Sequence, residues 1–251
     1  MTNDSYLFRN INNNKSLPLY EGKMIHQFKN HFAEPKYWIN ENDGRKAILG
    51  RSNDNNQVLD YQCYRLGFRD IASSTNERTF ISTITPKVFH GNKLPQFKIF
   101  NENNERLIND IDLLYLCVFF NSFVVDWHVR TRITSTLNFH YVYQTPIPRL
   151  TNRDKWYFQL EHRAARLICT TAEYAELWEE VMKTKWTDKV GASQEDERNR
   201  LRAELDGIIA HIYGLTEEEF TYILSTFPIV PQVQKVAPQN AYRDVSNGVI
   251  K

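Results

Sequence analysis

Residues 64–86 read YRLGFRDIASSTNERTFISTITP, and this stretch decides how the rest of the chain is organised. Two apolar and β-branched runs, YRLGF (64–68) and TFISTIT (79–85), flank the polar segment ASSTNER (72–78). Such runs on either side of a group of Ser, Thr and Asn residues are typical of two strands joined by a loop. The sequence therefore predicts a hairpin at its centre.

Two arginines of this hairpin admit two interpretations. Arg69 closes the first run and Arg78 precedes the second, so both stand at the same end of the predicted strand pair. Arginine recognises phosphates and guanine through paired hydrogen bonds, and short polar side chains suit contacts with base edges. In the alternative interpretation the hairpin is an ordinary structural one, and the arginines pair with Asp70 and Glu77.

The composition is that of a folded protein. The chain has 251 residues, 41% of them hydrophobic and 13% aromatic, which is enough for a sizeable core and predicts one domain plus an appendage. Lys and Arg total 31 against 30 Asp and Glu, so any nucleic-acid binding must depend on local patches. Three widely separated cysteines and a polar N-terminus without a signal pattern predict a cytoplasmic protein without a zinc site or disulfides.

Polar segments precede and follow the hairpin. Residues 1–16 are rich in Asn and are expected to form a flexible lead-in, followed by a short strand near Lys23. Residues 40–60 are expected to be exposed loop, with at most a short strand at KAIL (46–49). The loop at residues 87–97 is the most cationic in the first half, and it carries Lys87, Asn92 and Lys93.

An apolar run at residues 110–130, DIDLLYLCVFFNSFVVDWHVR, follows. Its apolar residues cover nearly the whole helix circumference, so the sequence predicts one buried central helix capped by Asp110 or Asp112. Asn121, Ser122 and Asp126 interrupt the run, which makes a membrane span unfavourable.

A polar, cationic segment comes after this helix. It holds Arg130, Arg132, Ser135, Thr136 and Asn138, and a predicted aromatic strand, FHYVY (139–143), follows. The segment is either a solvated connection or a second loop that meets the hairpin loop on one binding surface.

From residue 151 onward the sequence is rich in helix formers. Four helical stretches are expected up to residue 230, with capping boxes at Thr170–Glu173 and Thr216–Glu219 and a stop at Gly214. Residues 231–251 are expected to form an extended tail. The predicted organisation is thus an α+β target-binding globule at 17–150 and a helical spacer or docking region at 151–230.

The common catalytic signatures are missing. The chain has no GxGxxG, P-loop, HExxH or GxSxG motif. Glu21-Gly-Lys23 and Glu34-Pro-Lys36 have the Glu-x-Lys spacing of metal-dependent nucleases, but no upstream Asp on a convincing strand completes a metal site. A nuclease centred on Glu34 and Lys36 remains one alternative.

Four blocks, taken in order, carry a family resemblance: LPLYEGKMIHQF (17–28), the hairpin (64–86), LNFHYVYQTPIPRL (137–150) and ELDGIIAHIYGLTEEEFTYILSTFP (204–228). Together they resemble the C-terminal target-recognition region of type IIG restriction–modification proteins and related TaqI-like adenine-N6 DNA methyltransferases. The resemblance covers about residues 17–230. It implies a module that recognises specific double-stranded DNA sequences and works with a methyltransferase or endonuclease domain or subunit.

The resemblance also implies limits. The family's Asn-Pro-Pro-Tyr motif and cofactor loop are not present, so no enzymatic activity and no cofactor are expected of this chain. S-adenosylmethionine and Mg²⁺ are expected only for the catalytic domains of a parent enzyme. A second alternative is a protein-interaction module that docks on such a subunit without reading DNA.

Family loops vary with the target, so the predicted DNA-binding residues rest on loop position and residue chemistry alone. They are Lys23, Arg69, Asn76, Arg78, Lys87, Asn92, Lys93, Arg130, Arg132, Ser135, Thr136 and Asn138.

Overall fold

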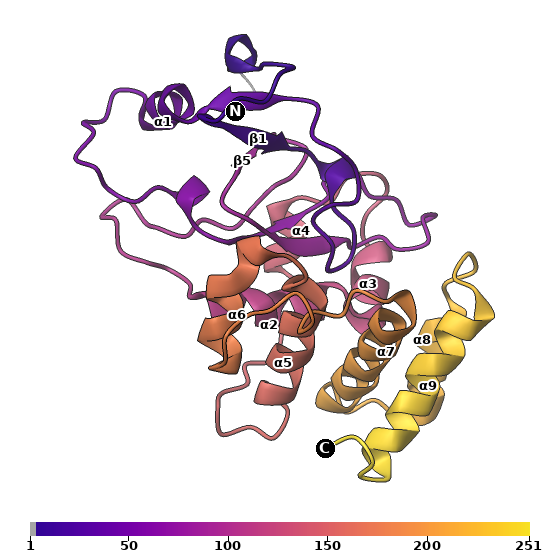
Figure 1. Ribbon diagram of the computed structural model, residues 1–251. Helices are drawn as coiled ribbons and strands as arrows, with labels where there is room; N and C mark the ends of the chain where they lie inside the picture. Colours follow the sequence, from indigo (N-terminus) through magenta and orange to yellow (C-terminus); the bar gives the residue numbers. More distant parts are fainter. Residues whose placement is uncertain (1–3) are drawn as a thin grey trace.

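The computed structural model describes residues 4–251 and has an α+β fold (Figure 1). Two small sheets and long loops make up most of the first hundred residues, and helices occupy the rest of the chain. The strands are β1 (Ser16–Tyr20), β2 (Trp38–Asn40), β3 (Arg65–Phe68), β4 (Ser82–Thr85) and β5 (Phe89–His90). The α-helices are α1 (Glu41–Leu49), α2 (Asp110–Phe120), α3 (Phe123–Arg130), α4 (Phe139–Tyr143), α5 (Tyr157–Ile168), α6 (Ala175–Met182), α7 (Glu195–Ile212), α8 (Glu217–Ser225) and α9 (Gln232–Ser246). Short 3-10 helices are η1 (Ser5–Leu7), η2 (Gly22–Met24), η3 (Asp60–Gln62) and η4 (Ala172–Tyr174).

The predicted hairpin is confirmed. β3 and β4 pair antiparallel, with Arg65 opposite Thr85 and Phe68 opposite Ser82. Every residue of both strands is buried, because α2 packs against this two-stranded sheet.

The other sheet lies next to residues 5–16, which were expected to belong to a flexible lead-in. β1 lies between β2, which is antiparallel to it, and β5, which is parallel to it. Residues 1–3 lie outside the described part of the chain. From residue 5 onward the segment is anchored rather than free, because Arg9 bridges to Trp38 and Leu7 belongs to a small core with Ile39.

α1 replaces the first part of the loop expected at residues 40–60, whereas residues 50–59 form a loop as predicted. Asn40 caps this helix, and its side chain accepts hydrogen bonds from the backbone N–H groups of Asn42 and Asp43. Glu41 and Asp43 lie in the first turn, where negative charge is favourable. The Asn and Asp residues at the beginning of this stretch therefore form a helix start and not a loop.

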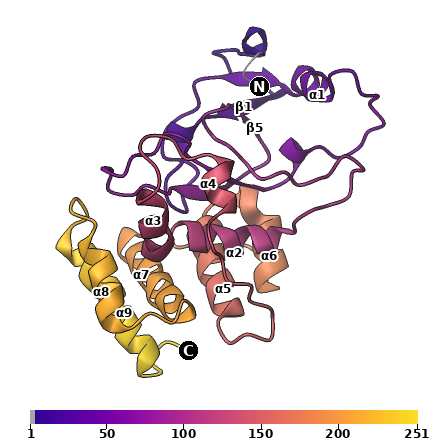
Figure 2. The same cartoon turned by 180° about the vertical axis from the view of Figure 1, so that it is seen from behind.

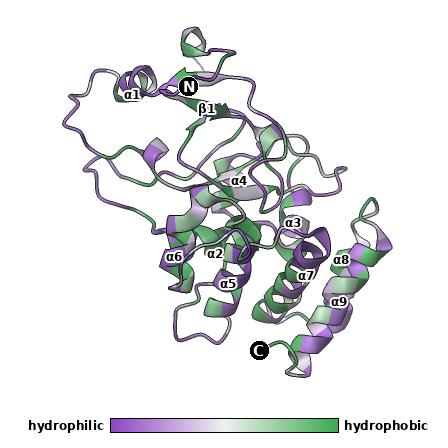
Figure 3. Ribbon diagram, viewed as in Figure 1, coloured by the Kyte–Doolittle hydropathy of each residue, from purple (hydrophilic) through white to green (hydrophobic). Residues whose placement is uncertain are grey.

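The predicted central helix is two helices. α2 and α3 are bent by 66° at a break formed by Asn121 and Ser122. Asn109, not Asp110 or Asp112, caps α2, and the Ser122 hydroxyl accepts the N–H of Val125 to start α3. The expectation of deep burial is confirmed, and α2 is hydrophobic over most of its length (Figure 3).

The apolar run of α2 and α3 also bears on whether the chain has a membrane-spanning helix. Within residues 4–251 no single helix is long and apolar enough to cross a membrane. α2 and α3 reach that length and apolar character only when they are taken together, as a bent pair.

The predicted strand FHYVY is wrong, since it forms the short helix α4. Asn138 caps this helix by accepting the N–H of His140. α4 lies between the β-containing part and α2 (Figures 1 and 2). Aromatic alternation over five residues fits either structure, and here the cap and the packing of Phe139 against Phe68 and Phe97 decide for the helix.

The helical character of residues 151–230 is confirmed. The Thr216–Glu219 capping box forms at the start of α8, and Gly214, with φ of 68°, follows the end of α7. The capping box predicted at Thr170–Glu173 does not form. The 3-10 helix η4 begins after Thr171 instead, and the hydroxyl of Thr171 donates to Glu173.

The extended tail predicted at 231–251 is also wrong. α9 packs along α7 at the outer edge of the helical part (Figure 1). Pro238 lies inside α9, where it cannot donate to the carbonyl of Gln234, and a proline usually argues against a helix. Burial of Pro238, Ala241, Tyr242 and Val245 against neighbouring helices outweighs that loss.

One large core extends across the boundary predicted at residue 150. It includes Phe80 and Phe120, whose rings stack with centroids 4.5 Å apart, together with Leu167 and Ile208 from the helices. Residues 17–150 and 151–230 therefore share buried surface, and the helical region is part of the same packing unit.

A buried carboxyl in this core gives a pH-dependent prediction. Glu161 on α5 is 2% exposed, its Oε1 atom has no hydrogen-bond partner among the described residues, and burial raises its pKa to about 7. The folded state holds this proton more tightly than the unfolded state, so the stability that this group contributes is lost as pH rises from 4.5 towards 7. We expect Glu161→Gln to raise the free energy of unfolding by about 1–2 kcal/mol above pH ~7. Urea unfolding across the pH range checks this, and a variant whose curve stays parallel to that of the wild type would contradict it.

Candidate nucleic-acid interface

The two polar loops flagged by the sequence lie side by side. The backbone N–H of Ala72 donates to the carbonyl of Ser135 at 3.1 Å, and the N–H of Leu137 donates to the carbonyl of Asp70 at 2.8 Å. Ile71 and Thr136 form an isolated β-bridge between these two bonds. We name residues 70–78 and 131–138 the paired loops.

The paired loops present short polar side chains and one unpaired cation to solvent. Ser74, Thr75 and Asn76 are exposed on the first loop. Arg132, Ser135 and Thr136 are exposed on the second, and Arg132 makes no ion pair within residues 4–251. Asn138 is exposed as well, although its side-chain oxygen is used to cap α4. Glu77 is an exposed acid on the same surface.

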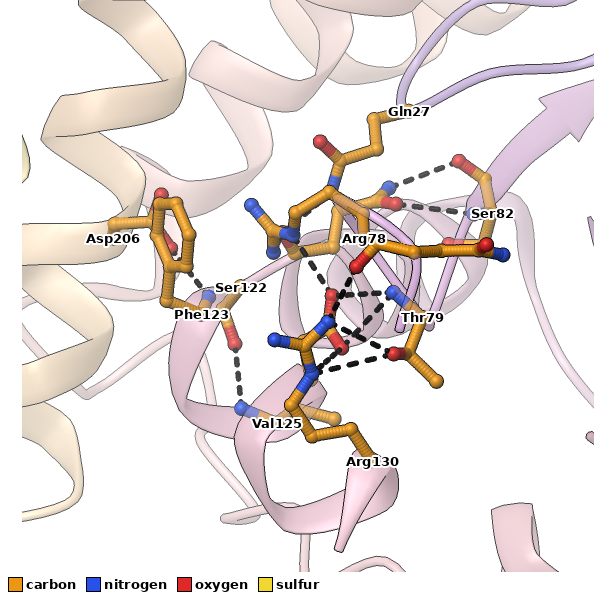
Figure 4. Close-up of polar contacts among 12 residues, drawn as sticks. Gln27, Arg78, Thr79, Ser82, Ser122, Phe123, Val125, Arg130 and Asp206 are labelled. Atoms are coloured by element: carbon orange, nitrogen blue, oxygen red, sulfur yellow. Dashed lines mark hydrogen bonds and ion pairs between the residues drawn. The ribbon is translucent and has the colours of Figure 1, made fainter. Parts of the chain in front are cut away.

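A buried charged network lies beneath the paired loops (Figure 4). Asp126 is completely buried, and its carboxylate accepts the Nε–H of Arg78 at 2.8 Å and the backbone N–H of Thr79 at 3.0 Å. Arg78 also donates to the carbonyl of Asn121 at 2.6 Å and lies 4.0 Å above the ring of Phe123. The protein therefore holds the guanidinium of Arg78 through its Nε and Nη2 groups.

Arg130 completes this network from the other side. It is 7% exposed and donates to the carbonyl of Asn76 at 2.8 Å and to the hydroxyl of Thr79 at 3.2 Å. Its guanidinium lies 3.9 Å from the centroid of the Phe227 ring. Because these contacts hold the first of the paired loops from below, Arg130 has a positioning role.

Three predicted DNA-contacting arginines are therefore misassigned as surface groups. Arg78 and Arg130 are buried in the network, and half-buried Arg69 donates to the carbonyls of Gly22 and Ile25, each at 3.0 Å from its Nε. The ordinary-hairpin interpretation is also wrong in detail, since neither Arg69 nor Arg78 pairs with Asp70 or Glu77. The missed signal was Asp126, an acid inside an apolar run that requires a buried cationic partner.

Of the lysines predicted to bind DNA, Lys23 and Lys93 lie at the loop end of the hairpin and Lys87 lies at its opposite end. Lys93 pairs with Asp70 at 3.0 Å, which puts it beside the paired loops, and exposed Asn92 precedes it. Lys23 is exposed and pairs with Glu21 at 3.0 Å, in the turn that Arg69 binds. Lys87 follows β4 at the opposite end of the hairpin and pairs with Glu176 at 2.6 Å, so it does not belong to this surface.

Two buried polar side chains that the sequence did not single out as site residues fix the geometry. Asn121, at the break between α2 and α3, accepts the N–H of Ser82 at 3.0 Å and donates to its carbonyl at 2.9 Å. Asp206 on α7 accepts the N–H of Phe123 at 2.8 Å, and burial raises the pKa of its carboxyl to about 6. These contacts tie the break to β4 and the start of α3 to α7.

A metal-dependent nuclease needs a group of side chains that can hold a metal ion. Within residues 4–251 there is no group of three or more His, Cys, Asp or Glu side chains placed to hold one. Glu34 lines a groove with His31 and Glu173, whereas Lys36 lies over the ring of Tyr37 at 4.9 Å. Glu34 and Lys36 thus have different neighbours.

Comparison of the chain with protein-family models, with curated proteins and with solved structures finds no match to any of them.

Proposed function

We propose that the paired loops are the recognition surface of a sequence-specific module for double-stranded DNA. The observation that carries this proposal is the backbone link between Asp70–Ala72 and Ser135–Leu137, which joins two polar loops from distant parts of the sequence. The four-block resemblance to restriction–modification target-recognition regions supports the same function.

The side chains on the paired loops suit this role. Arg132 can donate two parallel hydrogen bonds to a guanine or to a phosphate, and Asn76 can pair with an adenine edge. Ser135 and Thr136 can position the backbone of the duplex. Lys23 and Lys93 add positive charge nearby, each with part of that charge neutralised by an acid.

Prearrangement of the loops favours recognition over loose charge attraction. Arg130 and Arg78 hold the loop base from inside, so little conformational entropy is lost when a ligand binds. With a net charge of +1, binding by the isolated chain should be weak and should fall steeply with salt. Methyl transfer or cleavage would come from a catalytic partner.

Arg132→Ala tests the proposal. Selection of bound duplexes from a random pool first provides the target, and a fluorescence titration then measures affinity. We expect the variant to weaken binding of the selected duplex by about 1–3 kcal/mol, because one bidentate contact is lost.

The matched control is Arg153→Ala, which removes an exposed arginine from the loop before α5. That control should leave affinity unchanged. Equal affinity of the Arg132→Ala variant and the wild type, or failure of the pool to yield any preferred duplex, would refute the proposal.

A further inference from the structure

A cleft of about 330 Å³ opens where the β-containing part meets α7 and α9. The segment with Lys29 and Phe32 forms one wall, and α7 forms another with Arg198 and Arg202. Val233, in the first turn of α9, lies at the edge. The floor contains Arg78, Phe123 and Asp206, so the cleft reaches the buried network of Figure 4.

Arg198 brings a buried charge to this cleft without a neutralising partner. It is 5% exposed, and its guanidinium donates to the carbonyls of Phe28 at 2.9 Å, Leu167 at 2.7 Å and Ala192 at 2.9 Å. No carboxylate of residues 4–251 lies within ion-pair distance of it. Because carbonyl dipoles do not cancel a full charge, a positive potential extends into the cleft.

Two further cations face the same space with donors to spare. Lys29 is exposed and makes no ion pair in the described part of the chain. Arg202 uses only its Nη2 atom, which bonds to Glu195 at 2.7 Å and to Asn199. Its Nη1 and Nε groups have no hydrogen-bond partner there.

The acids of the lining do not cancel this field. Three carboxylates line the cleft with Lys29, Arg198 and Arg202, whereas Arg78 on the floor is already paired with Asp126. Of the carboxylates, Glu195 is used by Arg202, Asp206 by the N–H of Phe123, and Glu77 lies on the exposed loop. A ligand with several acceptor oxygens is therefore favoured.

We propose that this cleft binds a phosphate group. Lys29 approaches from one wall and Arg198 and Arg202 approach from α7, which suits a tetrahedral anion with three or four acceptor oxygens better than a planar carboxylate. The phosphate is carried by a free nucleotide or by the DNA backbone. Phe32, which is 53% exposed and packs against His26 with ring centroids 4.8 Å apart, gives a sugar or base an apolar contact.

The cleft shares Glu77 and Arg78 with the first of the paired loops, so its test changes neither of these residues. Inorganic phosphate is titrated into the isotope-labelled full chain at constant ionic strength with chloride as the reference, and backbone amide shifts are followed. We expect saturable shifts confined to the segments around Lys29, Asn199 and Val233.

Two surface variants keep the test free of folding defects. Lys29→Gln removes a cation, and Val233→Glu places a negative charge at a side chain that is 79% exposed. Each should weaken phosphate binding about tenfold or more. The control Lys46→Gln removes an exposed, unpaired lysine of α1 and should leave the affinity unchanged.

Two further titrations, with adenosine monophosphate and with duplex DNA, identify the molecule that carries the phosphate. Binding of adenosine monophosphate about tenfold tighter than phosphate assigns the cleft to a free nucleotide. Displacement of phosphate by duplex DNA, with no gain for the nucleotide, assigns it to the DNA backbone. Shifts no larger than with chloride, or equal weakening by Lys29→Gln and Lys46→Gln, would overturn the site.

Discussion

Asp126→Ala is expected to lower the free energy of unfolding by about 3–5 kcal/mol, because it leaves two buried guanidiniums without a counter-charge. Asp126 is 0% exposed, Arg78 is 8% exposed and Arg130 is 7% exposed, so water cannot replace the lost carboxylate. The N–H of Thr79 loses its acceptor at the same time. Urea unfolding followed by circular dichroism measures the change.

Adding Arg78→Met to Asp126→Ala should restore part of the lost stability, since it removes one uncompensated buried cation. Asp188→Ala, at an exposed acid, serves as the control and should change stability little. If Asp126→Ala unfolds at the same urea concentration as this control, the network does not hold the loops as described.

Gly207→Ala is the second change with a large expected effect. A Cβ atom at this position would lie 2.7 Å from the backbone nitrogen of Tyr242 and 2.8 Å from the carbonyl carbon of Ala241. Neither backbone atom can move unless α9 shifts away from α7. We expect a loss of about 1–3 kcal/mol, even though Ala favours a helix over Gly by about 1 kcal/mol.

Hydrogen exchange of the α9 amides tests this expectation, because a displaced helix exchanges faster at every position. Gly91→Ala is the matched control, since its added Cβ would make ordinary contacts with the carbonyl oxygen of Tyr20 at 3.6 Å and the Cγ atom of Glu21 at 3.9 Å. A Gly207→Ala variant with unchanged α9 exchange and higher stability would show that helix propensity decides at this site.

Sequence reasoning worked best where hydrophobic pattern and local chemistry agree. The β3–β4 hairpin, the burial of residues 110–130 and the Thr216–Glu219 capping box were all predicted correctly. It failed where a long-range contact decides, as in α9, whose Pro238 is offset by packing on α7. It also failed in α4, where five aromatic and apolar residues fit either a strand or a helix.

For the candidate site, the position of the loops was predicted but the burial of their arginines was not. The convergence of the two polar loops was a hypothesis that the backbone bonds of Ala72 and Leu137 now bear out in position. The choice of Arg69, Arg78 and Arg130 as surface groups was wrong, because a charged side chain next to a loop is exposed only if no buried acid or carbonyl captures it.

By itself the sequence determined the α+β class, the hairpin and the helical second half, since these depend on periodicity and capping between near neighbours. Only the tertiary structure decided which cations are free. Asp126 lies 48 residues from Arg78, and Arg198 reaches the carbonyl of Phe28 across 170 residues. The charge available to a ligand depends on such distant partners, because each N–H group that a protein acceptor holds is one donor fewer for a ligand.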